Sequence, residues 1–149
     1  MKNNKHEVMN VRLLLLFVAV LVTSCSSSSQ PGLGVYPKAV GAADEGFAIQ
    51  ALRTIATAQT QFKVTRGSYG DFESLTQAGF LDQRFASATP TLKGYRLSMR
   101  SSESEFTVNA DPETQPQGTT GSRHFYLDSS DNAIHVNVTQ TAGKTDPIL

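Results

Sequence analysis

The stretch AIQALRTIATAQTQF, residues 48–62, has apolar residues that recur at intervals of three and four. This spacing places them along one side of an α-helix, with polar residues on the other side. The expected buried stripe consists of Ala48, Ala51, Leu52, Ile55, Ala58, Gln59 and Phe62, and the expected exposed side of Arg53, Thr54, Thr57, Gln61 and Lys63. A helix with one apolar stripe must pack on another element, so the rest of the chain has to supply a surface that covers it.

The helix is predicted to extend from Asp44 to Arg66. Asp44 and Glu45 indicate a first turn, because the helix dipole stabilises acidic side chains there. Arg66 followed by Gly67 indicates the end of the helix. The many threonines lower the intrinsic helix propensity, so this helix needs a sheet to lie on.

The second half of the chain is predicted to form that sheet. Four segments alternate strictly between apolar and polar residues, which is typical of antiparallel strands with one buried face and one wet face. The predicted strands are 94–100, 105–110, 123–128 and 133–138. Turns at 101–104 and 129–132 and a loop over 111–122 connect them. Before the strands, we expect a short helix over 72–78, capped by Asp71, and an irregular stretch over 82–91. The predicted fold class is α+β, with one long N-terminal helix packed on a four-stranded antiparallel sheet.

The first 24 residues have the features of a secretion signal. Lys2, Lys5 and Arg12 form a basic start, and an unbroken apolar run follows over residues 13–22. A helix of that length rises about 15 Å, half of the hydrocarbon core of a bilayer. The run is therefore too short to span a membrane and has the length of a signal-peptide core.

Val22-Thr23-Ser24-Cys25 follows the apolar run directly and resembles the lipobox of bacterial lipoproteins. The resemblance implies cleavage between Ser24 and Cys25 and a lipid, with palmitate, on Cys25; an ordinary signal peptide with a chance cysteine is the alternative. Ser26 after the cysteine favours the outer membrane, facing the periplasm or the cell surface. The expected organisation is a signal peptide over 1–24, the lipidated cysteine with a Ser/Pro/Gly-rich tether over 25–43, and a folded domain over 44–149.

The composition excludes some classes of function. Without the signal, the chain has ten basic and twelve acidic residues, which leaves no positive surplus for nucleic acid. Cys25 is the only cysteine of the 149 residues, so the folded part must hold together by packing without a disulfide. The expected partners are the membrane, through the N-terminal lipid, and an unidentified envelope protein; no nucleic acid and no cofactor is expected.

The segment after the long helix carries an ordered pattern of aromatic, glycine and leucine residues. It reads F-x4-G-x-Y-x2-F-x2-L-x3-G-x-L and consists of Phe62, Gly67, Tyr69, Phe72, Leu75, Gly79 and Leu81. The pattern resembles the stretch after the long helix in type IV pilins and type II secretion pseudopilins, and residues 109–126 and 146–149 are similar to the later part of pilin-like proteins. The resemblance implies a pilin-like domain over 44–149. Pilins anchor and polymerise through an apolar N-terminal helix that this chain lacks after processing, so a lipid is expected to replace it.

The candidate binding residues lie on the wet face of the predicted sheet. An interaction surface for a protein or a glycan is expected there, with a merely solvated face as the alternative; it consists of Arg96, Arg100, Arg123, His124, Tyr126 and His135. If residues 129–132 form the turn, Tyr126 lies opposite His135 and His124 lies opposite Asn137, so the two imidazoles are diagonal neighbours.

Three kinds of chemistry are weighed at this face. The two histidines with Asp128 could hold zinc, and the turn residues Asp128, Asp131 and Asn132 offer weak calcium ligands without EF-hand spacing. Ser122, His124 and Asp128 have the residue types of a hydrolase triad, but they come from one strand without a nucleophile elbow.

The leading hypothesis is a non-enzymatic envelope lipoprotein with a pilin-like structural or protein-interaction module, associated with a type IV pilus or a type II secretion-like system. The alternatives are an envelope lipoprotein that binds a small ligand or metal ion and, more weakly, an envelope hydrolase.

Overall fold

Helix α2 (Tyr36–Arg66) is the first element of the computed structural model, which describes residues 36–115, 118–119 and 121–149. The predicted signal peptide, the cleavage site at Ser24 and the lipid-bearing Cys25 lie outside the described residues. After α2 come α3 (Phe72–Gln77), the 3-10 helix η1 (Gln83–Phe85), β1 (Thr91–Leu92), β2 (Tyr95–Ser101), β3 (Phe106–Pro112), β4 (Thr114–Gln115), β5 (Gly118–Thr119), β6 (His124–Asp128) and β7 (Ile134–Asn137).

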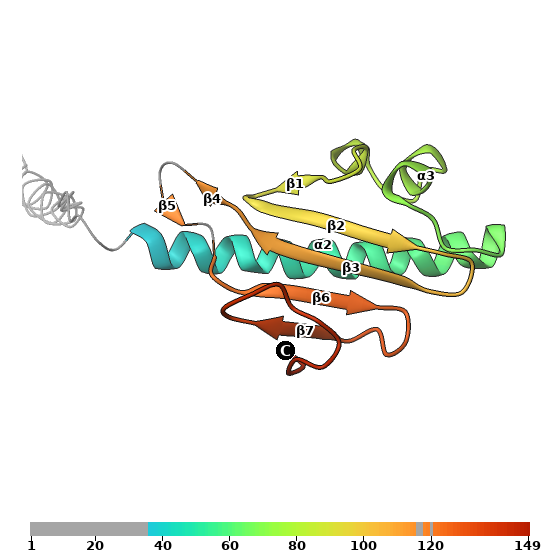
Figure 1. Cartoon of the computed structure of the whole chain (residues 1–149). Helices are drawn as coiled ribbons and strands as arrows, with labels where there is room; N and C mark the ends of the chain where they lie inside the picture. The colour runs from blue at the N-terminus through green and yellow to red at the C-terminus, as the bar shows by residue number, and fades with distance from the viewer. Residues whose placement is uncertain (1–35, 116–117, 120) are drawn as a thin grey trace, which may run out of the picture. The chain divides into compact units, whose positions relative to one another are not determined.

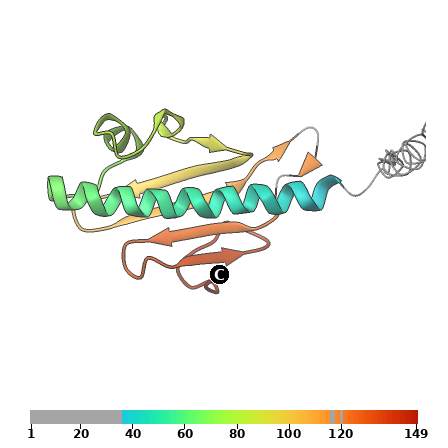
Figure 2. The same cartoon turned by 180° about the vertical axis from the view of Figure 1, so that it is seen from behind.

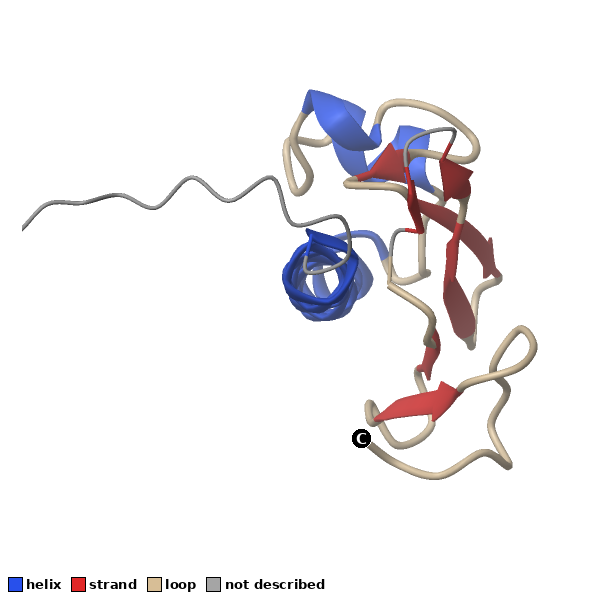
Figure 3. Cartoon of the chain, turned by 90° about the vertical axis from the view of Figure 1, so that its left-hand side faces the viewer, coloured by secondary structure: helices blue, strands red, loops and turns tan. Residues whose placement is uncertain are grey.

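Helix α2 lies lengthwise along one face of an antiparallel sheet with the strand order β1-β2-β3-β6-β7 (Figure 1). The view from behind shows the helix in front of the strands (Figure 2). The end-on view shows the sheet passing to one side of α2, with α3 at one end of the sheet and β7 at the other (Figure 3). The α+β class predicted from the sequence is therefore confirmed.

The helix and the sheet bury their apolar faces against each other. All members of the predicted stripe are buried, and Leu52, Ile55 and Gln59 have no exposed surface. The sheet contributes inward-facing side chains from four strands: Tyr95, Leu97, Phe106, Val108, Ala110, Phe125, Leu127 and Ile134. Each large aliphatic or aromatic side chain in this core contributes about 1.5–3 kcal/mol through its burial.

The predicted start of the long helix is wrong. The helix begins at Tyr36 instead of Asp44, so residues 36–43, assigned from the sequence to the tether, form about two further turns. Asp44 and Glu45 consequently lie inside the helix, and its first turn contains no acidic residue. Glu45 precedes Ala48 by three positions, which places it on the buried face, and it lies beyond the first turn, to which the effect of the helix dipole is confined.

The prediction of four strands is also corrected, because the sheet has five. Strand β1 is too short to show an alternating pattern, and it pairs with β2 through Thr91↔Arg96 and Leu92↔Tyr95. Lys93 and Gly94 join the two strands with φ angles of 49° and 76°, as a primed hairpin turn requires. The stretches predicted as irregular or loop also contain the 3-10 helix η1 and the small β4–β5 pair.

Other local predictions are confirmed. The carboxylate of Asp71 accepts a hydrogen bond from the amide of Ser74 at 2.8 Å and caps α3, as the sequence indicated. Strands β6 and β7 pair with His124 opposite Asn137 and Tyr126 opposite His135, which is the predicted register. The two histidines therefore do lie on the outer face of the sheet, the face turned away from α2.

Candidate functional site

Two of the predicted interaction residues lie exposed on the outer face of β2. Arg96 and Arg100 alternate with the inward-facing residues of this strand. A guanidinium nitrogen of Arg96 lies 3.9 Å from the carboxylate of Glu113, a contact that solvent weakens. Arg100 borders a shallow hollow of about 230 Å³ whose lining includes Ser102 and Thr107. This part of the predicted surface is accessible to a partner.

Arg123 does not belong to that surface, which corrects the sequence assignment. Its Nη2 and Nε atoms lie 2.7 and 2.8 Å from Oε2 of Glu45. The other carboxylate oxygen of Glu45 accepts hydrogen bonds from the backbone amides of Ser122, at 3.0 Å, and Arg123, at 3.3 Å. Glu45 therefore connects helix α2 to the residues that lead into β6.

Two further residues complete this buried connection. The hydroxyl of Tyr95 donates to the backbone carbonyl of Arg123 at 3.0 Å, and burial together with Glu45 raises the pKa of that hydroxyl. A Cβ atom at Gly121 would overlap the Glu45 side chain and the Tyr95 hydroxyl, so only glycine fits there. The sequence contained one indication of this connection, because Glu45 has the spacing of the buried stripe.

His124 pairs with a residue that the sequence did not single out. Its Nδ1 lies 2.6 Å from Oδ1 of Asp111, which occupies the neighbouring position on β3. The triad named from the sequence does not assemble, since Asp128 is at the opposite end of β6, about 13 Å away along the strand. The amide of Ser122 is bound to Glu45 instead.

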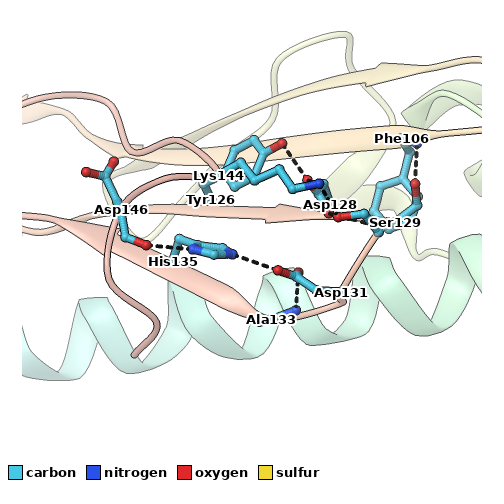
Figure 4. Close-up of polar contacts among 10 residues, drawn as sticks. Phe106, Tyr126, Asp128, Ser129, Asp131, Ala133, His135, Lys144 and Asp146 are labelled. Carbon is cyan, nitrogen blue, oxygen red and sulfur yellow. Dashed lines mark hydrogen bonds and ion pairs between the residues drawn. The ribbon is translucent and has the colours of Figure 1, made fainter.

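His135 is buried, so its place on the predicted interaction surface is also wrong. Only 4% of its surface is exposed, because the C-terminal segment (residues 139–149) folds back against β7. Its Nδ1 lies 2.7 Å from the backbone carbonyl of Asp146, and its Nε2 lies 3.1 Å from Oδ2 of Asp131 (Figure 4). The ring of Tyr126 packs edge-on against the imidazole, at 5.9 Å between centroids.

Hydrogen bonds hold the C-terminal segment in place. The amide of Val136 donates to the carbonyl of Pro147 at 2.9 Å, and the amide of Leu149 donates to the carbonyl of Ile134 at 2.8 Å. Three side chains add further bonds: Asn109 to the carbonyl of Ala142, Asn137 to the carboxylate of Asp146, and Lys144 to the hydroxyl of Ser130. This segment covers part of the face that the sequence predicted to be wet.

The weak calcium candidates serve the β6–β7 turn. Asp128 accepts hydrogen bonds from the amide and hydroxyl of Ser130 and from the hydroxyl of Tyr126. Burial raises the pKa of Asp128, but these hydrogen bonds outweigh it and lower the pKa overall; the pKa of Tyr126 rises to about 12. Asp131 accepts from the amide of Ala133, and Asn132 takes the left-handed turn conformation at φ 57°. Within the described ranges, no three His, Cys, Asp or Glu side chains are grouped so that they could share a metal ion.

A second hollow, of about 420 Å³, lies between α2, η1 and β1. Its lining includes Phe47, Ala51, Phe85, Leu92, Arg84 and Lys93. The amine of Lys93 lies 5.6 Å from the centre of the half-exposed Phe47 ring. A lipoprotein that binds a small ligand, the alternative left open by the sequence, would use this hollow and not the outer face of the sheet.

Helix α2 is long, and its exposed side carries polar residues such as Arg53, Thr54 and Thr57 together with a few apolar ones such as Phe47 and Val64. Over the part of the chain that the structure describes, no helix combines the length and the hydropathy needed to cross a membrane. Comparisons of the chain with protein-family models, with curated proteins and with solved structures gave no match.

Proposed function

We propose that the chain is a lipid-anchored protein of the bacterial cell envelope whose folded domain is a non-enzymatic, pilin-like structural or protein-interaction module. The observation that carries the proposal is the order of its parts. A sequence resembling a lipobox ends at Cys25, and a long helix laid on an antiparallel sheet begins at Tyr36. The aromatic and glycine pattern after that helix supports the relation to pilins and pseudopilins, and with it an association with a type IV pilus or type II secretion-like system at the outer membrane.

The packing of α2 favours a module that docks as a single domain over one that polymerises through this helix. Its apolar stripe already covers the protein's own sheet, with Leu52 and Ile55 fully buried. Turning that stripe toward another subunit would uncover both side chains at a cost of several kcal/mol. Since a domain of this size is stable by only about 5–15 kcal/mol, the helix is better used within its own domain.

The outer face of β2 is the best candidate for the docking surface. Arg96, Ser98 and Arg100 are exposed there in alternate positions, and Arg100 borders a hollow. The two guanidinium groups are exposed, and solvent weakens the contact of Arg96 with Glu113, so both can bind a partner with acidic side chains or another anionic surface. His124 and Tyr126, which are only partly buried, extend this surface toward β6.

The lipid anchor is tested by replacing Cys25 with serine. The Cys25→Ser chain is expected to incorporate no labelled palmitate and to move from the membrane to the soluble fraction, because serine provides no thiol for the lipid. Metabolic labelling followed by membrane fractionation measures both. Ser26→Ala is the matched control and should keep the label. Palmitate incorporation into the Cys25→Ser chain would contradict the lipoprotein assignment.

The docking surface is tested by photo-crosslinking in cells. A photoreactive amino acid at Ser98, on the outer face of β2, is expected to give a discrete crosslinked product. The same amino acid at Thr57, on the exposed side of α2, should give none. Combining the Ser98 probe with Arg96→Glu and Arg100→Glu should remove the product. A product from Thr57 that survives these changes would place the partner on the helix.

A further inference from the structure

His135 lies between two groups that can only accept hydrogen bonds. Its Nδ1 faces a backbone carbonyl, that of Asp146, at 2.7 Å, and its Nε2 faces a carboxylate, that of Asp131, at 3.1 Å. A neutral imidazole carries one N–H and can donate to only one of them, whereas the imidazolium donates to both. Because the side chain is 4% exposed, water is poorly placed to satisfy the acceptor that would be left over.

The charged groups around the ring also favour a protonated imidazole. The β6–β7 turn contributes Asp131 and Asp128, and the C-terminal segment contributes Asp146 and Lys144, whose amine lies 3.8 Å from the carboxylate of Asp128. Asp146 reaches the ring through its backbone carbonyl, and its carboxylate accepts from Asn137 and from the amide of Gly143. Two carboxylates, those of Asp131 and Asp128, thus act on the ring against one amine, which favours a cation there. Besides Asp128, β6 places the hydroxyl of Tyr126 near the ring, and the raised pKa of this hydroxyl keeps it neutral.

We infer that His135 is protonated when the C-terminal segment is closed on β7, and that this proton holds the segment there as a pH-sensitive latch. Both partners of the imidazolium matter to the latch. Asp146 belongs to the C-terminal segment, and Asp131 belongs to the turn at the other end of β7. The protonated ring therefore connects the C-terminal segment to β7 at His135, the residue that also forms a β-bridge with Ile148.

The latch can act on this segment because apolar burial secures it only weakly. Ala142 is its one buried residue, whereas Ile148 and Leu149 remain largely exposed. Segments held mainly by hydrogen bonds open locally at low free-energy cost. Loss of the proton leaves one of the two acceptors without a donor, so closure weakens. Opening frees the amide of Val136 and the carbonyl of Ile134 at the edge of the sheet.

The direction of the pH dependence follows from linkage. The hydrogen bond to the Asp146 carbonyl raises the pKa of His135, burial opposes this, and Asp131 raises it further, so that the pKa lies above its ordinary value. The amide of Ala133 and the imidazole itself lower the pKa of Asp131, which stays ionised. The contribution of the proton to closure is therefore fully present below the pKa of the free imidazole, about 6.5, and is lost as the pH rises through the higher pKa of the closed state.

Amide hydrogen exchange of the full chain in detergent micelles tests the latch, with the ring nitrogen shifts of His135 recorded in the same samples. Between the two pKa values, the protection of the Val136 and Leu149 amides, corrected for intrinsic exchange, should fall by about tenfold per pH unit. The amide of Leu97, which donates to the carbonyl of Pro90 at the other end of the sheet, should keep the same protection over this pH range. Ring shifts of a neutral imidazole down to pH 6 would overturn the inference, and so would titration without any change in protection.

Two variants test the role of the His135 ring directly. His135→Gln imitates the neutral imidazole, with a donor for only one acceptor, so protection of Val136 should be low and independent of pH. Asp131→Asn, in the exposed turn, leaves the histidine in place and should move the midpoint to lower pH. His124→Gln is the matched control, because His124 pairs with Asp111 away from this segment, and it should keep the wild-type profile. An unchanged midpoint in Asp131→Asn would overturn the inference even if His135→Gln fails to fold.

Discussion

Replacing Glu45 with alanine is expected to lower the free energy of unfolding by about 3 kcal/mol. The change removes the carboxylate oxygen that binds the Arg123 guanidinium and the second oxygen, which accepts from two backbone amides just before β6. A broken buried ion pair costs about 3–5 kcal/mol, and the lower end applies because 37% of the Arg123 side chain is exposed. Urea denaturation with a constant m-value measures the loss.

The neighbouring acid provides the control for this substitution. Asp44 precedes Glu45 on α2 and is only partly buried, so Asp44→Ala should change the free energy of unfolding by less than about 0.5 kcal/mol. Equal stability of the two variants would show that the Glu45–Arg123 contact does not contribute. Arg123 is for the same reason unsuited as a surface probe, because changing it is expected to destabilise the domain.

Gln59→Leu is expected to destabilise the domain by about 2–4 kcal/mol, although leucine is apolar and similar in size. Gln59 is fully buried, and its amide donates to the carbonyl of Gly70 at 2.6 Å and accepts from the amide of Gly70 at 3.0 Å. The substitution leaves both backbone groups of Gly70 buried without partners, at about 1–3 kcal/mol for each. Thermal and urea unfolding report the difference.

Gln61→Leu is the matched control, because it makes the same substitution on the exposed side of the same helix. Its effect on the free energy of unfolding should stay within about 0.5 kcal/mol. A Gln59→Leu chain as stable as the Gln61→Leu chain would mean that Gly70 finds other partners, and that the hydrogen bonds between helix and loop carry no net stability.

Local patterns in the sequence predicted much of the fold. The three-and-four spacing of Leu52, Ile55 and Phe62 predicted the buried side of α2, and strict alternation predicted the four longer strands, β2, β3, β6 and β7, with the β6–β7 register. These predictions succeed because each depends on residues a few positions apart. The predicted start of α2 was wrong because residues 36–43 contain a proline and a glycine, as a tether does, and no acidic residue marks the first turn.

The arrangement of the candidate site depends on contacts that no local pattern contains. Glu45 and Arg123 are 78 positions apart, and the residues around Arg123 in the sequence say nothing about an acid on a distant helix. The C-terminal segment has no periodicity of its own, and its place is set by side chains such as Asn109 and by the edge of β7. The sequence therefore predicted which face His135 lies on, but not what covers that face.

The position of Glu45 near the N-terminal end of α2 has a mechanical consequence. A pull applied along the axis of α2 would act parallel to the strands, because the helix lies lengthwise along them (Figure 1). Such a force shears the helix along the sheet and loads the carboxylate bonds of Glu45 together, so they resist in parallel instead of opening one by one. The C-terminal segment lies against β7 and shares none of the Glu45 bonds, so a pull on α2 would not load it directly.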